Sequence, residues 1–213
     1  VDSSPAVGIV LPNNNEPRWV QDETRFKEAL DSAGLKAEIL FSQGDPALEK
    51  TNVQTLLKKG IKILIICPQD SAAAYGAVEE ARSRGVKVIA YDRLVTGTDA
   101  VDFFVTFDAV SVGRAQGQYL IDKRTARNTP LYLYAGAVVD NNTFLFFAGA
   151  WEVLQPRIAD GSFVIKNSSE AAALKSRATL TRDEISRIIT QISTNWDYST
   201  AENLAKANLS AVA

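Results

Sequence analysis

Short apolar segments rich in β-branched residues alternate with segments of helical length through the first half of this chain. The expected strands are AVGIVL (6–11), KAEILF (36–41), KILIIC (62–67), VKVIAYD (86–92) and FFVTF (103–107). The expected helices between them, each ending at a glycine that suits a helix C-terminus, are residues 17–34, 46–60 and 71–85. This alternation predicts βαβ units, and therefore an α/β fold in which helices flank a parallel sheet.

The second half repeats the pattern with fewer strands. We expect helices at 109–123 and 141–156, and strands at 130–136 and 162–166. Helical segments then follow one another without a strand between them, at 168–176, 181–196 and 199–213. Two strands make a poor free-standing sheet, since ordinary sheets carry about five. The sequence therefore predicts two lobes, 1–107 and 108–213, of which the second is incomplete.

Composition excludes several classes of function. The chain has 23 basic and 25 acidic residues, and this balance argues against nucleic acid or an anionic membrane surface as a partner. It has no histidine, and its single cysteine, Cys67, lies inside an apolar segment, so we expect a buried thiol, no metal site, no cofactor and no histidine-dependent catalysis. No segment reaches the roughly 18–20 apolar residues that span a bilayer. The remaining class is a binding protein, not an enzyme.

Polar side chains gather where the expected strands end. In open parallel sheets, ligands bind outside the carboxyl ends of the strands. The groups expected there are NNNEPRW (13–19), PQD (68–70), Asp92, Arg93 and Asp108 in the first half, and DNN (140–142) in the second. Carboxylates, amides and guanidinium groups match the paired hydroxyls of a sugar, and an aromatic face covers its apolar side. A neutral polyol fits best, because the glycine-rich turns that bind phosphate are absent from the sequence.

Each of these features also has a plainer explanation. Asp92 and Arg93 could form an ordinary ion pair at a turn, and the DNN motif at 140–142 suits a helix N-cap. The aromatic residues of segment 144–151 have the spacing of core residues on a helix, with Phe146 on a different face. A binding site is favoured because all of these groups are expected at one edge of the two predicted sheets.

Together the motifs resemble the periplasmic sugar-binding proteins of ABC transporters, with the type I, ribose-binding-like fold, and most closely the D-xylose-binding branch. The segments that carry the resemblance span residues 6–160 and are EPRWVQD, IICPQD, VIAYDRL, FFVTFDAVSVGRAQGQYL and YAGAVVDNNTFLFFAGAWEVLQPRI. The resemblance implies that two lobes close around D-xylose or a similar aldose. The residues that it implies for ligand binding are Arg18, Trp19, Asp92, Arg93, Asp140, Asn142, Phe146 and Trp196.

The resemblance also implies a different role in ligand binding for the polar and for the aromatic members of these eight residues. Charged and amide groups hydrogen-bond the sugar hydroxyls, while Phe146 and Trp19 cover the faces of the ring. Trp196 corresponds to a tryptophan that occurs later in the second lobe of the family.

The resemblance also implies a location and partners. It points to an extracellular or periplasmic protein, with a lipid anchor on the precursor as one option, that delivers a monosaccharide to an ABC permease or a membrane sensor kinase. We interpret the opening residues VDSSPAVG as a trimmed start, left by signal-peptide cleavage or by cloning. Family members continue beyond the point that matches Ala213, so we expect a truncated chain that a C-terminal fragment could complete.

Two other functions remain open. A truncated chain could be an interaction module that binds no sugar and that dimerises, or binds a partner, through its open second-lobe edge. The effector domain of a LacI-like repressor shares the fold, but no helix-turn-helix precedes the first strand and the chain is not basic. A response to sugar would favour the binding protein, whereas a tight dimer without that response would favour the interaction module.

Overall fold

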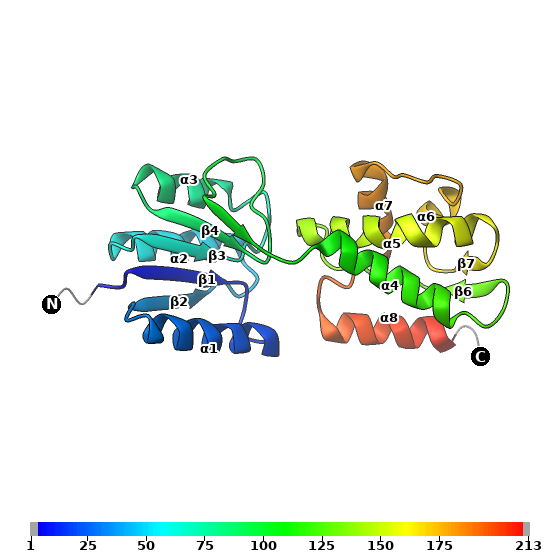
Figure 1. Cartoon of the computed structure of the whole chain (residues 1–213), viewed down its shortest axis with the longest axis horizontal. Helices are drawn as coiled ribbons and strands as arrows, with labels where there is room; N and C mark the ends of the chain where they lie inside the picture. The colour runs from blue at the N-terminus through cyan, green and yellow to red at the C-terminus, as the bar shows by residue number, and fades with distance from the viewer. Residues whose placement is uncertain (1–3, 211–213) are drawn as a thin grey trace. The chain divides into compact units, whose positions relative to one another are not determined.

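The computed structural model describes residues 4–210, which fall into two compact units that divide between Thr106 and Phe107 (Figure 1). In the first unit, strands and helices alternate as the sequence predicts. Its elements are β1 (Val7–Leu11), α1 (Pro17–Ser32), β2 (Ala37–Phe41), α2 (Pro46–Lys58), β3 (Ile63–Ile66), α3 (Tyr75–Ser83), β4 (Lys87–Tyr91) and β5 (Phe103–Val105). The predicted α/β class is confirmed for this unit.

The five strands of the first unit pair in parallel, in the order β2-β1-β3-β4-β5. The strand order reverses between β1 and β3, because the chain steps from β1 to one side for β2 and returns to the other side for β3. Sheets with such a switch point bind ligands beyond the carboxyl ends of their strands. The topology therefore marks the loops after β1, β3 and β4 as the place to look for a site.

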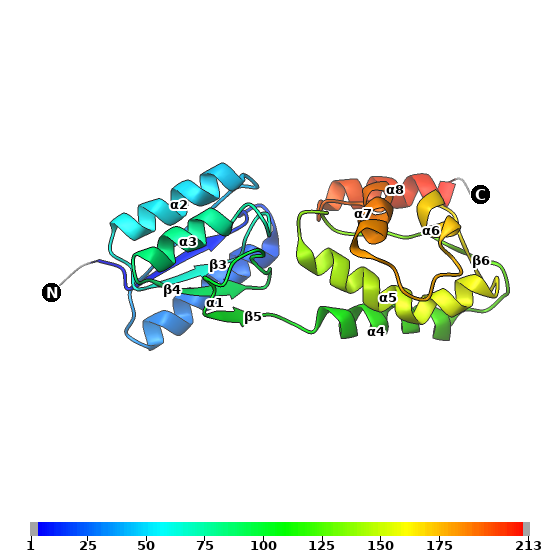
Figure 2. The same cartoon turned by 90° about the horizontal axis from the view of Figure 1, so that it is seen from above.

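Helices cover both faces of this sheet, with α1 on one face and α2 and α3 on the other (Figure 2). Val7, Ile9 and Leu11 of β1 pack into the cluster on the α1 side, whereas Val10 packs against α2 and α3. Burial on both faces explains why β1 is apolar along its whole length. Cys67 is fully buried on the α1 side, as the sequence predicts.

The second unit contains one two-stranded parallel sheet among its described residues. Its elements are α4 (Ala109–Lys123), β6 (Thr129–Leu131), α5 (Asn141–Ala159), β7 (Phe163–Ile165), α6 (Ser169–Ala173), α7 (Arg182–Ile192) and α8 (Tyr198–Ser210). The core gathers apolar side chains of α5 and α7 around the two strands. Two strands followed by three helices agree with the sequence pattern and give a partial lobe.

One predicted strand of the second unit was too long. The pattern predicts a strand over 130–136, but β6 ends at Leu131. Beyond it, the Leu133 N–H donates to the Asn167 side-chain oxygen at 2.8 Å, and the Leu133 carbonyl accepts from the same amide at 2.7 Å. A side chain thus replaces a strand as the hydrogen-bonding partner, which local sequence alone does not show.

Several predicted helix boundaries were also wrong. The helices expected over 168–176 and 181–196 end at Ala173 and Ile192. The helix expected over 71–85 begins only at Tyr75, because the Asp70 carboxylate accepts from the Ala72 and Ala73 N–H groups and forms a turn there. The helix expected to end at residue 156 continues through Pro156 to Ala159. Residues 211–213 of the last predicted helix lie outside the described residues. Within 4–210, no helix is both long and apolar enough to cross a bilayer.

Candidate functional site

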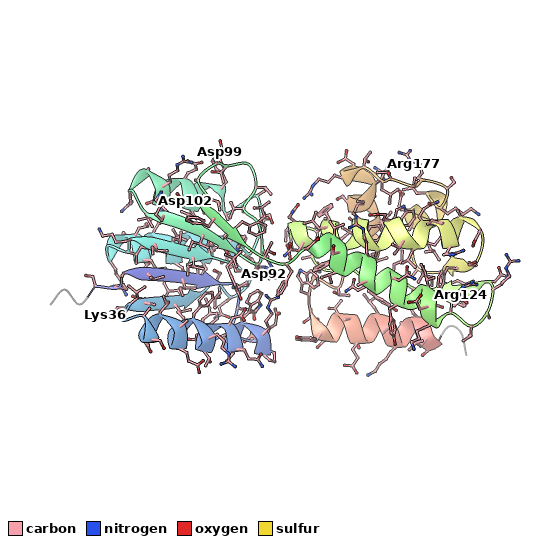
Figure 3. The ribbon with its side chains drawn as sticks, viewed as in Figure 1. Lys36, Asp92, Asp99, Asp102, Arg124 and Arg177 are labelled. Atoms are coloured by element: carbon pink, nitrogen blue, oxygen red, sulfur yellow. The ribbon has the colours of Figure 1, made fainter. Side chains whose placement is uncertain are left out.

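Asp92 and Arg93 directly follow β4 at the carboxyl edge of the five-stranded sheet, where Figure 3 labels Asp92. The Asp92 backbone has φ of 62°, a left-handed conformation that aspartate tolerates better than most residues. Its N–H donates to the Val105 carbonyl at 2.8 Å, and its own carbonyl accepts from the Thr106 hydroxyl at 2.8 Å. The end of β5 therefore fixes the turn that carries the two charged side chains.

Arg18 lies in the first turn of α1, which begins at Pro17 directly after the loop that follows β1. Its Nη2 is 3.3 Å from Asp92 Oδ2, and its Nε is 3.6 Å from Asp22 Oδ2. Burial would lower the pKa of the Arg18 guanidinium, but the neighbouring Asp92 and Asp22 carboxylates outweigh this effect and raise the pKa. Arg18 is therefore a fixed cation beside a largely buried carboxylate.

Asp22 and Tyr91 extend this network, and the sequence analysis missed both as candidates. The Tyr91 hydroxyl donates to Asp22 Oδ2 at 3.1 Å, the same oxygen that pairs with Arg18. Burial, followed by the Asp22 charge, raises the pKa of the Tyr91 hydroxyl, so it stays a neutral donor. The signal that could have identified Asp22 is its spacing of four residues from Arg18 on one helix face.

Trp19 lies deeper than the sequence analysis expected. Its exposed fraction is only 2%, and it packs with Leu11 and Cys67 in the apolar cluster. The guanidinium carbons of Arg18 and Arg93 lie 4.6 and 5.6 Å from the centroid of its ring. The expected contact between this ring and a sugar face does not suit such burial. Trp19 instead supports the two cations through cation–π contacts.

Arg93 is nearly buried and contacts the loop that follows β3. Its Nη1 donates to the Pro68 carbonyl at 3.3 Å. The next N–H of that loop, from Gln69, donates to Glu49 Oε2 of α2 at 2.7 Å. Burial raises the pKa of the Glu49 carboxyl to about 7, against the opposing effects of the Gln69 N–H and the Arg93 charge. The sequence analysis missed Glu49, which reads as an ordinary surface residue of a helix.

Glu49 gives the first unit a stability that depends on pH. Because its pKa is raised in the folded state, its contribution is fully present below about pH 4.3, the ordinary pKa of glutamate, and is lost as pH rises through about 7. We expect Glu49→Gln to match the wild type at pH 4 and to exceed its free energy of unfolding by about 3 kcal/mol at pH 8. Urea unfolding of both proteins across this range measures the difference, and a constant difference would contradict the assignment.

In the second unit, Asp140 caps α5 and also contacts a distant aromatic residue. Its Oδ1 accepts from the Asn142 N–H at 2.9 Å, and its Oδ2 accepts from the Trp196 indole N–H at 3.1 Å. The capping role considered from the sequence is thus confirmed. Asp140 and Asn142 are 3% and 5% exposed, so a polar cluster lies buried at the start of α5.

Phe146 and Trp196 form an aromatic pair beside this cluster. Their ring centroids are 6.4 Å apart, and the ring planes are inclined by 82°. Trp196 follows α7 in a left-handed conformation with φ of 62°. Its indole lies directly against Gly136, where an added Cβ would be 2.1 Å from the ring. Three segments that are far apart in sequence therefore meet here, and glycine is required at one of them.

Gly136→Ala is expected to displace the Trp196 indole, since a methyl group at that position would overlap it. Overpacking of this kind costs about 1–3 kcal/mol, and the displaced ring would lose its bond to Asp140. The indole N–H resonance of Trp196 should shift in a ¹H–¹⁵N spectrum, while that of Trp151 stays in place. Gly76→Ala is the control, because nothing lies within 4 Å of the added Cβ. An unmoved Trp196 resonance would disprove the contact.

The structure brings the eight predicted residues together in two groups, one in each unit. In the first group Arg18 and Arg93 lie against the Trp19 ring and Arg18 pairs with Asp92. In the second, Asp140 and Asn142 lie beside Phe146 and Trp196. Both groups combine paired hydrogen-bonding groups with aromatic rings. Within residues 4–210, no three His, Cys, Asp or Glu side chains gather as metal ligands.

Comparisons with known proteins found relatives over most of the chain. A model of the periplasmic binding protein domain matches residues 7–213. The multiple sugar-binding periplasmic protein SbpA of Azospirillum brasilense is 33% identical over 165 residues, which cover 76% of this chain and 46% of that protein. The D-xylose-binding periplasmic protein of Escherichia coli is 30% identical over 159 residues, which cover 75% and 47%. The chain therefore spans about half the length of the curated relatives it matches.

Solved structures extend the similarity. A carbohydrate transporter solute-binding protein from Chloroflexus aurantiacus, in complex with D-glucose, is 65% identical with a TM-score of 0.93, covering 97% of this chain and 61% of that one. An ABC transporter solute-binding protein from Clostridium phytofermentans, with bound β-D-glucose, is 27% identical with a TM-score of 0.81 and covers 96% and 59%.

Proposed function

We propose, since this chain belongs to the periplasmic binding protein family, that it binds an aldose monosaccharide through residues of both units. The observation that carries the proposal is the first group of residues, in which the buried Asp92 carboxylate is 3.3 Å from the Arg18 guanidinium and is followed in sequence by a second buried guanidinium residue, Arg93. Such a group presents acceptors and donors side by side. Neighbouring hydroxyls of a sugar need both.

The chemistry of the two groups fits a neutral ring with hydroxyls. Asp92 accepts hydrogen bonds from the sugar, while Arg18 and Arg93 donate to it. In the second group, both oxygens of Asp140 already accept one bond, but each carboxylate oxygen has two lone pairs and can accept another. The Phe146 ring suits the apolar face of a pyranose. The opposite charges screen each other, so the groups favour a neutral ligand over an ion.

The nature of the aldose is a finer part of the proposal. The D-xylose predicted from the sequence differs from D-glucose by the hydroxymethyl group at C5, and both sugars have an equatorial hydroxyl pattern. D-glucose is the ligand in the 65% identical structure, and D-xylose is the ligand named for the Escherichia coli relative. We therefore propose D-glucose and D-xylose as the first two candidates.

The wider role proposed here follows from the same family. The protein would act outside the cytoplasm, with the two units serving as the predicted lobes, 1–107 and 108–213, and would present its sugar to an ABC permease or a sensor kinase. No step of this role requires catalysis. A lipid anchor on the precursor remains part of the proposal.

Thermal unfolding with and without sugars tests the proposal. A ligand at a hundredfold its dissociation constant adds about 2.7 kcal/mol, which raises the melting temperature by about 5–11 °C for a chain of this size. We expect this shift with D-glucose or D-xylose at millimolar concentration, and a smaller one with D-ribose. A folded protein that responds to none of these sugars would contradict the proposal.

The interaction module remains the second candidate, and exposed apolar surface favours it. All three residues of the edge strand β5 are exposed, Phe103 by 64%, and Phe107 beyond them is 71% exposed. In the second unit, Tyr119 of α4 and Leu209 of α8 are more than 60% exposed. Sedimentation equilibrium distinguishes this function, because a tight dimer without a sugar response is its signature.

A further inference from the structure

Glu49 is a buried carboxyl group that is not among the residues proposed to contact the sugar. It lies on α2, is 1% exposed, and packs beside the apolar cluster that contains Val53 and Leu56. Acidic side chains are almost never buried to this degree unless they are paired. Among residues 4–210, its carboxylate accepts one hydrogen bond, which comes from a backbone group, the Gln69 N–H, at 2.7 Å. A buried acid retained at this cost calls for an explanation beyond packing.

The contacts of Glu49 lead to Arg93 in two steps. The Gln69 N–H donates to Glu49, and the carbonyl of the preceding residue, Pro68, accepts from Arg93 Nη1 at 3.3 Å. One peptide unit of the loop after β3 is thus held by the carboxylate on one side and by the guanidinium on the other. The Arg93 charge also acts directly on the Glu49 carboxyl.

We propose that Glu49 is a positioning residue for the sugar site, which holds the Pro68–Gln69 peptide and the Arg93 guanidinium in place most firmly when it is ionised. The inference rests on the proposed function, because it concerns the affinity for the same sugar. Burial makes ionisation of Glu49 costly for the stability of the whole unit, but the charge strengthens its local bond to the Gln69 N–H, because a charge-assisted hydrogen bond is roughly twice as strong as a neutral one. Protonation of Glu49 therefore loosens the loop and Arg93 together, and sugar affinity falls with it.

Few other groups can produce this effect near neutral pH. The chain has no histidine, the side chain that ordinarily titrates there. Besides Arg93, the charged group that acts on Glu49 is Asp70, which follows Gln69. The acidic residues of elements packed against α2 have partners of their own. In α3, Glu80 accepts from Gln54 and Arg84, and Glu79 accepts from the Thr98 hydroxyl; in β2, Glu38 accepts from Lys59.

Isothermal titration with D-glucose from pH 5.5 to 8.5 tests the proposal in the wild type, in Glu49→Gln and in Glu38→Gln. Glutamine keeps the shape and the acceptor oxygen of Glu49, so the first variant is expected to fold. The wild-type dissociation constant should fall about fivefold as pH rises through 7. Glu49→Gln should keep the weaker, low-pH value throughout, while the surface control Glu38→Gln should follow the wild type. A Glu49→Gln profile equal to that of the wild type would overturn the proposal.

A second readout does not depend on sugar. The Nε–Hε resonance of Arg93, assigned by its loss in Arg93→Lys, should move with pH in the free wild-type protein, with a midpoint near 7, and should stay fixed in Glu49→Gln. If the wild type binds no sugar, the proposed function fails while this titration still decides the link between Glu49 and Arg93. If the chemical shift of the Arg93 resonance does not change with pH in the wild type, that link is overturned.

Discussion

Asp92→Asn is expected to bind its monosaccharide at least about 100-fold more weakly than the wild-type protein, while folding normally. Asp92 is 9% exposed and is 3.3 Å from the Arg18 guanidinium, with Arg93 as its neighbour in sequence. In the proposed complex the Asp92 carboxylate accepts hydrogen bonds from the sugar; loss of such a buried charged partner costs about 2–5 kcal/mol in binding, and about 2.7 kcal/mol corresponds to a 100-fold change. Asparagine also tolerates the left-handed backbone at φ of 62°. The variant therefore isolates the charge from the turn.

Isothermal titration with D-glucose and D-xylose measures this loss, and urea unfolding checks that the first unit keeps its stability. Asp122→Asn is the matched control, because Asp122 lies on the exposed face of α4 and, among residues 4–210, accepts a side-chain hydrogen bond only from Gln118. It should bind sugar as the wild type does. Wild-type affinity in Asp92→Asn would remove Asp92 from the site and leave it as a structural turn residue.

Asp92 and Arg93 also illustrate what could be predicted from sequence. Parallel strands all end at the same edge of a sheet, so a residue that directly follows an apolar strand is placed by topology alone. The same argument placed Arg18 after β1 and Asp140 after β6, and the structure joins Arg18 to Asp92 through a 3.3 Å ion pair. The fold class and the groups at the strand ends were therefore accessible without coordinates.

The burial of individual side chains and the contacts between distant residues could not be predicted from the sequence in this way. Trp19 and Arg18 are adjacent in sequence, yet the turn of α1 buries one ring and leaves the other side chain half exposed. Glu49 is buried because its helix turns that position toward the loop after β3, and nothing in the segment PALEKT indicates this. The end of β6 likewise depends on Asn167, which lies 34 residues away from Leu133. Each of these outcomes is decided by tertiary contacts that a periodic pattern does not encode.

The same limit applies to the glycines of the second unit, which look ordinary in sequence and are decisive in the structure. Helices α4 and α5 approach so closely that a Cβ added at Gly149 would lie 2.0 Å from the Val110 carbonyl oxygen. A Cβ at Gly113, on the facing helix, would lie 2.1 Å from the Phe146 carbonyl oxygen. Both of the atoms that clash are backbone carbonyl oxygens, which cannot move by a change of rotamer as the end of a side chain can. The two helices would have to separate.

Gly149→Ala is therefore expected to destabilise the second unit by about 3 kcal/mol or more, although alanine is the better helix former by about 1 kcal/mol. The same substitution at Gly76 in α3 meets nothing within 4 Å and should be neutral or slightly stabilising. Hydrogen exchange of peptides from α4 and α5 measures the effect in the second unit alone, with the peptides of β1 and β3 as an internal reference. Because α5 begins at the Asp140 cap and carries Phe146, the loosened pair should also weaken sugar binding. Unchanged exchange in Gly149→Ala would mean that the helices can separate without cost, and the close packing of α4 on α5 would then not be what orders the second group of residues.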